Sequence, residues 1–194
     1  MTAMTVAQRM TAKEFLAAPE PDHGRPWNLV GGEVIVNDPT VLHGRTQQRL
    51  LMALADWTGA AEGRGSVEWP ADVGLDERNV FVPDLLWYAE GRAPEETDPP
   101  PYPMPDLAVE IRSPATWRFD IGAKKDAYER HGLPELWLVD TVAQTILVFR
   151  RSTVAAPRFD VALELAEGEQ LTCSAVAGLR GARGDGLQQP LADC

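Results

Sequence analysis

The chain contains few cysteines, little lysine and no long apolar run. Its two cysteines, Cys173 and Cys194, lie in the C-terminal tail at no metal-ligand spacing, which argues against a disulfide framework and a cysteine-based zinc site. No stretch approaches the roughly 20 consecutive apolar residues that a membrane-spanning helix needs. The first residues also lack the apolar run of a secretory signal. We therefore expect a cytoplasmic protein with no membrane partner.

Lysine is scarce even among the basic residues, because only Lys13, Lys124 and Lys125 contribute to the 18 lysines and arginines. With 29 acidic residues the formal net charge is −11. Such a surface repels the phosphate backbone of nucleic acids unless basic groups gather in one place. Two of the three lysines stand side by side in residues 105–132, "PDLAVEIRSPATWRFDIGAKKDAYERHG". The same stretch places an acidic residue, Glu110, inside an apolar strand pattern.

The hydrophobic pattern predicts one α/β domain over residues 1–194, because a chain of this length with 44% hydrophobic residues can bury one substantial core. In chain order, capping, periodicity and turn signals predict a short helix from Thr11, a hairpin over 27–37, a helix over 43–57, an antiparallel pair of strands from 66–75 and 80–89, a proline-rich loop over 91–105, a strand over 107–112, a helix over 120–131, and strands over 135–140, 145–151 and 158–165. Residues 177–194 have too little periodicity to assign.

Two carboxylates stand out against this pattern. Strand alternation puts Glu110 on the same face as Ala108 and Arg112, and Asp84 occupies a second apolar strand pattern. For a lone glutamate, an ion pair with an arginine or a solvated strand face is the commoner explanation. Two carboxylates about 5 Å apart, however, repel each other by roughly 3 kcal/mol at an effective dielectric of about 20, which favours uptake of a proton or a cation. Oxygen ligands from separate strands are also what a divalent cation needs.

The adjacent lysines fall on a predicted helix. Asp120, Lys124 and Tyr128 are spaced i, i+4 and i+8 on one side of it, whereas Lys125 is rotated by about 100°. An ammonium beside carboxylates can orient water, stabilise developing negative charge and exchange a proton, unlike an arginine. A solvated helix face is the alternative for at least one lysine, and it suits Lys125 better.

Six ordered motifs resemble the Uma2-like restriction endonuclease family, within the PD-(D/E)XK nuclease superfamily. They are "GGEVIV", "HGR", "VPDLLW", "LAVEIRSPAT", "DIGAKKDAY" and "GLPELWLVD", and the resemblance covers residues 27–150. It implies a restriction-endonuclease-like core at about 27–150, with a mixed central sheet flanked by helices, an N-terminal hairpin and extra antiparallel strands. Residues 151–194 would form C-terminal strands and a tail.

The resemblance also implies roles for individual residues. Asp84, Glu110 and the backbone carbonyl of Ile111 would bind the metal, and Glu33 would add a further acid. Lys124 would replace the superfamily lysine that usually stands two residues after the acid, where this chain has Arg112. His43 and Arg45, which match the "HGR" motif, would contact phosphate or support the acids, or would only cap and position their helix. The other roles come from the residues themselves and not from the resemblance. Arg112 departs from the family pattern and could hold a phosphate, Arg118 could contact nucleic acid, and Asp120 and Tyr128 would position Lys124.

These observations predict a Mg²⁺-dependent DNA endonuclease, with Mn²⁺ as a second possible cation and a homodimer as the expected assembly. A non-cleaving module that binds protein or nucleic acid is the main alternative, because fold does not guarantee activity. The net acidity favours it, and so does Arg112, which could pair with Glu110 and weaken metal binding. A metal-free carbohydrate hydrolase with two catalytic carboxylates is a distant third interpretation, because that mechanism gives the lysine no catalytic role.

Overall fold

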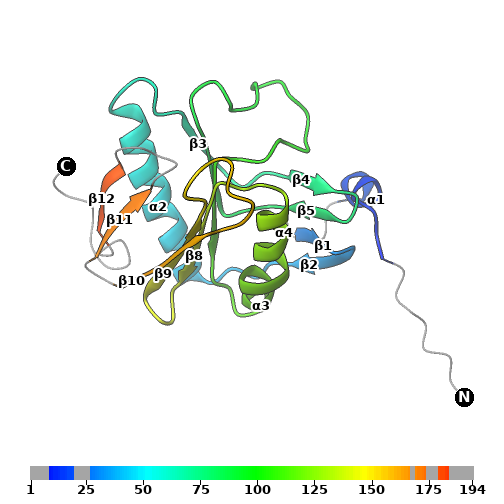
Figure 1. Ribbon diagram of the computed structural model, residues 1–194. Coiled ribbons are helices and arrows are strands. Elements are labelled where there is room, and N and C mark those ends of the chain that lie inside the picture. The colour runs from blue at the N-terminus through cyan, green and yellow to red at the C-terminus, as the bar shows by residue number, and fades with distance from the viewer. Residues whose placement is uncertain (1–8, 20–26, 167–168, 174–178, 184–194) are drawn as a thin grey trace, which may run out of the picture.

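Two β-sheets organise the protein in the computed structural model, which describes residues 9–19, 27–166, 169–173 and 179–183 (Figure 1). Cys194 and the rest of residues 184–194 lie outside the described part. The larger sheet has six strands in the order β10-β9-β8-β7-β6-β3, and the smaller has four in the order β2-β1-β5-β4. Strands β11 and β12 form a separate pair.

The elements in chain order are α1 (Ala12–Ala17), β1 (Trp27–Val30), β2 (Glu33–Val36), α2 (Val41–Gly59), β3 (Ser66–Glu68), β4 (Val73–Asp76), β5 (Asn79–Phe81), β6 (Leu85–Tyr88), β7 (Leu107–Ile111), α3 (Trp117–Phe119), the π-helical turn η1 (Asp120–Lys124), α4 (Lys125–Arg130), β8 (Glu135–Asp140), β9 (Thr145–Arg150), β10 (Val161–Ala166), β11 (Gln170–Cys173) and β12 (Leu179–Arg183).

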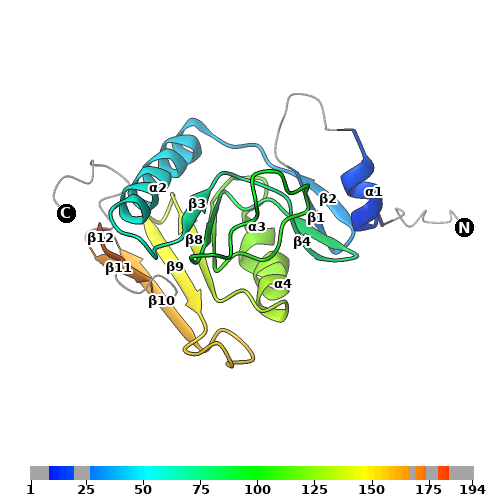
Figure 2. The ribbon, with the colours of Figure 1, turned by 90° about the horizontal axis from the view of Figure 1, so that it is seen from above.

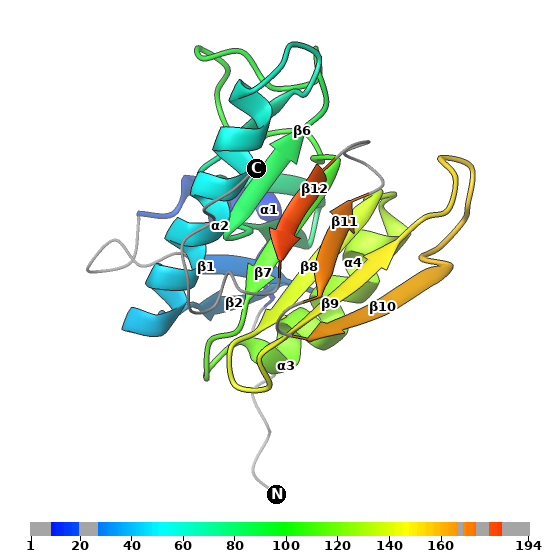
Figure 3. The same ribbon diagram turned by 90° about the vertical axis from the view of Figure 1, so that its left-hand side faces the viewer.

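The six-stranded sheet is mixed, because β7 and β8 pair in parallel while its other neighbours are antiparallel. Helix α2 covers one face, and α3 and α4 lie on the other (Figure 2, Figure 3). Leu50 and Leu54 of α2 pack against one side of the sheet, while Ala127 and Tyr128 of α4 pack against the other, next to Ala108. The predicted α/β fold with a mixed central sheet flanked by helices is confirmed. Within the described residues, no helix combines the length and apolar content needed to cross a bilayer.

The N-terminal elements follow local signals in the sequence. Thr11 and Glu14 form the predicted capping box at the start of α1. Gly31 and Gly32 have φ values of 59° and 83° and join β1 to β2 in the predicted hairpin. This hairpin extends the four-stranded sheet through β5, so it covers the same side of the molecule as α4.

The prediction of one antiparallel pair from residues 66–75 and 80–89 is wrong in detail. Each segment forms two strands, and the pieces belong to different sheets: β4 pairs with β5, whereas β3 pairs with β6. Pro70 and Pro83 lie between the pieces, where a residue without a backbone N–H interrupts the ladder. The chain therefore changes sheets just before Asp84, which precedes β6 instead of lying within it.

The proline-rich loop over 91–105 has neither helix nor strand, as predicted, but it is tied to the two sheets at several points. The Tyr88 hydroxyl donates to the Pro103 carbonyl at 2.9 Å, and the Tyr102 backbone N–H donates to the Asp72 backbone carbonyl at 2.7 Å. Asp106 accepts from the Ala89 N–H at 2.8 Å. These contacts fix the loop at the end of the sheet from which β7 begins.

Gly65 should be among the least replaceable residues of the scaffold. Its φ is +66°, and a Cβ there would lie 1.9 Å from the Tyr88 carbonyl oxygen. We expect Gly65→Ala to lower the free energy of unfolding by about 3 kcal/mol or more, because backbone strain and a backbone clash add. Gly63→Ala is the matched control, since Gly63 has a φ of +78° with nothing near its Cβ, and it should cost only about 1–2 kcal/mol. Urea denaturation measures both; equal losses would contradict the clash.

Candidate active site

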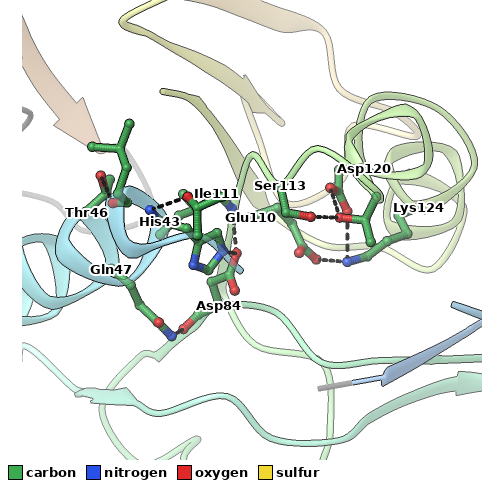
Figure 4. Close-up of polar contacts among 12 residues, drawn as sticks. His43, Thr46, Gln47, Asp84, Glu110, Ile111, Ser113, Asp120 and Lys124 are labelled. Atoms are coloured by element: carbon green, nitrogen blue, oxygen red, sulfur yellow. Dashed lines mark hydrogen bonds and ion pairs between the residues drawn. The ribbon is translucent and has the colours of Figure 1, made fainter. Parts of the chain in front are cut away.

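Two acidic side chains meet beside the C-terminal end of β7 (Figure 4). Glu110 is 4% exposed and points to the α4 side of the sheet, because its neighbours Val109 and Ile111 belong to the core on the α2 side. Asp84 is 6% exposed. Its Oδ2 accepts the Ile111 backbone N–H at 2.6 Å, and its own N–H donates to the Val109 carbonyl at 2.9 Å. The change of sheets at Asp84 thus brings its carboxylate next to Glu110.

A helical segment supplies the lysine. The prediction of a regular helix over 120–131 is wrong in form, because α3, η1 and α4 follow one another over 117–130 with a π-helical turn at 120–124. Lys124 Nζ lies 2.6 Å from Glu110 Oε1 and 3.1 Å from Asp120 Oδ1. The Tyr128 hydroxyl donates to the same Glu110 oxygen at 2.8 Å. π-Turns inside helices are frequent at functional sites, and here the turn ends at the lysine that reaches the acid.

The polar network extends beyond the lysine into the loop after β7. Asp120 Oδ2 accepts a hydrogen bond from the Thr116 hydroxyl at 3.2 Å, and the hydroxyls of Thr116 and Ser113 are 2.7 Å apart. All three side chains are buried. Sequence reasoning assigned Ser113 and Thr116 no role, although both belong to the quoted "SPAT" motif. Their spacing from Asp120 was the available signal.

Negative charge outweighs positive charge in this cluster. Burial raises the pKa of Glu110 to about 8, although Lys124 acts in the opposite direction. Burial also raises the pKa of Asp120. Burial alone would lower the pKa of Lys124, but the Glu110 and Asp120 carboxylates raise it above its usual value. Since Asp84, Glu110 and Asp120 face a single ammonium, the cluster is set to take up a proton or a cation.

The oxygen atoms that remain available fit a divalent cation. Asp84 Oδ2 and Glu110 Oε1 are held by the contacts above, whereas Asp84 Oδ1 and Glu110 Oε2 form no hydrogen bond or ion pair within the described part of the chain. The described residues contain no group of three or more His, Cys, Asp or Glu side chains placed to hold a metal. A cation here would therefore depend on two carboxylates, with main-chain or water oxygens completing its shell. That donor set suits Mg²⁺, which binds one or two carboxylates and keeps several waters.

Helix α2 holds Asp84 from the opposite face of the sheet. The Thr40 side chain caps α2 by accepting the His43 N–H at 3.2 Å. His43 is 2% exposed, and its Nε2 lies 3.2 Å from Asp84 Oδ2 without hydrogen-bond alignment. One turn later, Gln47 Nε2 donates to the Asp84 carbonyl at 2.9 Å. Sequence reasoning missed Gln47, although its i+4 spacing from His43 puts both on one helix face.

Comparison with known proteins identifies the family and the fold. A family model named Uma2, described as "Putative restriction endonuclease", matches residues 12–182. The chain belongs to the Uma2 family. A solved structure from Anabaena variabilis, described as "a putative nuclease belonging to DUF820", has a TM-score of 0.73 at 20% identity and covers 92% of this chain and 97% of that one. No curated protein matches the chain. The predicted family is confirmed, and the solved structure confirms the fold.

In this Uma2 protein, Arg112 does not pair with Glu110, which was one of the alternatives that the sequence left open. Arg112 could have paired with Glu110, but its Nη1 instead donates to both oxygens of Asp140, at 2.9 and 2.8 Å. The parallel register of β7 and β8 explains this choice, because Ile111 is opposite Val139 and the next residues are therefore neighbours. Lys124, and not Arg112, therefore forms the ion pair with Glu110.

Other predicted residues lie outside the acid cluster. Glu33 is exposed at the turn end of the hairpin, where Val30 is its strand partner and Gly32 donates to the Arg78 carbonyl. That end of β5 is opposite the end that leads to Asp84, so the structure does not bring Glu33 to the acids. Arg45 is exposed in the second turn of α2.

The exposed Arg118 and Lys125, the residue next to Lys124, each lie against an aromatic ring. The Arg118 guanidinium lies 4.6 Å from the ring centre of Phe119. Lys125 Nζ lies 4.8 Å from the ring centre of Phe149. The helix therefore presents Lys124 to the carboxylates and Lys125 to an aromatic surface, which makes the two lysines a matched pair for experiment.

Proposed function

We propose that this Uma2 protein is a divalent-cation-dependent endonuclease that hydrolyses phosphodiester bonds in DNA. The observation that carries the proposal is the buried contact of Lys124 with Glu110 beside Asp84, at one end of a mixed sheet. Two acids and a lysine from separate elements suit phosphoryl transfer, in which catalysis consists mainly of positioning and charge stabilisation. The family description supports the same class of activity.

Asp84, Glu110 and the Ile111 carbonyl would hold Mg²⁺ or Mn²⁺. When bound, such a cation supplies charge stabilisation on the phosphate and lowers the pKa of a water. The chain's own groups prepare the acids for this role. The Ile111 N–H donates to one oxygen of Asp84, next to His43, and the Tyr128 hydroxyl donates to one oxygen of Glu110. The second oxygen of each acid therefore stays available.

Lys124 would orient the attacking water and stabilise negative charge on the phosphate. Its position is set by Asp120, which Thr116 and Ser113 hold in turn. Asp120 is thus a positioning residue for the lysine. Its carboxylate also keeps Lys124 charged while Glu110 is engaged elsewhere. A homodimer stays a prediction from the family resemblance.

The proposal predicts cation-dependent cleavage of plasmid or single-stranded DNA, with Mg²⁺ or Mn²⁺ compared against EDTA. Asp84→Asn keeps the shape of the side chain but removes its charge, and it should lower the cleavage rate by about 10²-fold or more. Asp126→Asn is the matched control, because Asp126 is exposed in the first turn of α4. It should cleave like the native protein.

Two results would sink the nuclease assignment. One is native protein that cleaves neither substrate with either cation, which would favour a non-cleaving binding module. The other is an Asp84→Asn variant as active as Asp126→Asn, which would place the chemistry elsewhere.

A further inference from the structure

We propose that Arg112, held by Asp140 and Trp117, forms a subsite for a second phosphate of a nucleic-acid strand, next to the acid pair. This inference rests on the proposed function, because it names how the same site would hold its substrate beyond the phosphate that reacts. It is carried by the geometry of three side chains: Arg112 directly after β7, Asp140 at the end of β8 and Trp117 at the start of α3.

The guanidinium of Arg112 is held in place, but only one of its nitrogens forms hydrogen bonds within the described residues. One nitrogen, Nη1, makes both hydrogen bonds to Asp140. The guanidinium also lies over the Trp117 ring, 5.5 Å from its centre. Within the described residues, Nε and Nη2 make no hydrogen bond, and 31% of the side chain is exposed. A guanidinium carries five N–H groups in a rigid fork, so three remain to bind an anion.

Asp140 is itself anchored independently of Arg112. Its Oδ1 accepts the backbone N–H groups of Val142 and Ala143, at 2.9 and 3.0 Å, in the turn between β8 and β9. Partial burial acts to raise the pKa of Asp140, but these donors and Arg112 lower it below its usual value. The turn therefore holds the carboxylate, and the carboxylate holds the guanidinium. Pre-organisation of this kind reduces the entropy lost on binding.

The strand geometry points Arg112 to the side of the acid pair. Arg112 directly follows the last residue of β7, and its backbone N–H continues the pairing with β8 by donating to the Val139 carbonyl at 2.9 Å. Residues i and i+2 of an extended chain share a face at a separation of about 6.6 Å, which relates Arg112 to Glu110. Asp140 lies beside it, because β7 and β8 are parallel with Ile111 opposite Val139. A phosphate bound to Arg112 would thus neighbour the acid pair without replacing Lys124 at Glu110.

The ligand chemistry follows from the donor and from the net charge. Arginine presents parallel N–H groups that match two oxygens of a phosphate, which lysine cannot do. A chain with a net charge of −11 gives a strand no general attraction, so phosphate binding requires local, well-placed cations. The competing interpretation is a salt bridge that only ties β7 to β8.

Salt dependence separates these two interpretations. The probe is a fluorescein-labelled single-stranded 12-nucleotide DNA, bound to full-length protein in Ca²⁺ and followed by anisotropy over a series of NaCl concentrations. Each phosphate contact on a single strand contributes about −0.7 to the slope of log K against log salt. Arg112→Gln should therefore make the slope of log K against log salt less negative by about 0.7. Arg130→Gln, at an exposed position of α4, should leave it unchanged.

Arg112→Lys tests whether the paired N–H groups of the guanidinium are needed, because it keeps the charge but removes the fork. It should keep the slope but weaken binding roughly tenfold, because a charge-assisted hydrogen bond is lost. Thermal melting of all variants identifies any that misfold. An unchanged slope in Arg112→Gln, equal affinity in Arg112→Lys, or no binding by the native protein would overturn the subsite. If DNA is cleaved while the slope is unchanged, only the subsite fails; if binding follows Arg112 without cleavage, only the nuclease assignment fails.

Discussion

Replacing Lys124 with methionine is expected to lower DNA cleavage by about 10³-fold and the free energy of unfolding at pH 8 by about 3–5 kcal/mol. The ammonium is buried between Glu110 Oε1, at 2.6 Å, and Asp120 Oδ1, at 3.1 Å. Methionine fills a similar volume but leaves two buried carboxylates without their cation. Single-turnover cleavage and urea denaturation measure the two effects.

Lys125→Met is the matched control for that experiment. It removes the same charge from the adjacent residue, whose Nζ lies over the rings of Phe149 and Phe159. Loss of this contact should cost about 0.5–1 kcal/mol and leave cleavage unchanged. A Lys124→Met variant within tenfold of native activity would remove the lysine from the mechanism. Equal losses in both variants would mean that the helix responds only to its total charge.

Local periodicity predicted the parts of the site that lie within single elements. Alternation along residues 107–112 placed Glu110 on the face opposite Val109, and helical spacing placed Asp120, Lys124 and Tyr128 together. The helix nevertheless contains a π-turn. This turn was not predicted, because a π-turn has no periodic signature in a sequence. The lysine still reaches the acid, since Asp120 and Lys124 both border that turn.

Features that depend on pairing between distant segments were not predictable in the same way. Pro83 indicated an interruption, but not that β5 and β6 would join different sheets and leave Asp84 at the crossing. The partner of Arg112 depends on the register of β7 against β8, which no local pattern encodes. Glu33 was placed by resemblance alone, and the direction of the hairpin puts it at the wrong end of β5.

In the absence of divalent cations, the free energy of unfolding should fall as the pH rises from about 5 to 8. Burial raises the pKa of Glu110 from 4.5 to about 8. Between these values the folded protein holds a proton that the unfolded chain has released, so stability is highest below the lower value and is lost towards the upper one. For one proton the slope is at most about 1.4 kcal/mol per pH unit. The raised pKa of Asp120 acts in the same direction. The lowered pKa of Asp140 acts only in more acidic solution.

Glu110→Gln should flatten this pH dependence, because its amide oxygen can still accept from Tyr128 and Lys124 but carries no charge that must be neutralised. At pH 8 in EDTA the variant should be more stable than the native protein, although it should not cleave DNA. Saturating Mg²⁺ should stabilise the native protein at pH 8 and have little effect on the variant, since a ligand stabilises only the state that binds it.

Glu96→Gln, in the exposed part of the proline-rich loop, should behave like the native protein. Urea denaturation at pH 5, 6.5 and 8 provides the measurement. Parallel pH profiles for native protein and Glu110→Gln would show that Glu110 is not the group that exchanges its proton for a cation.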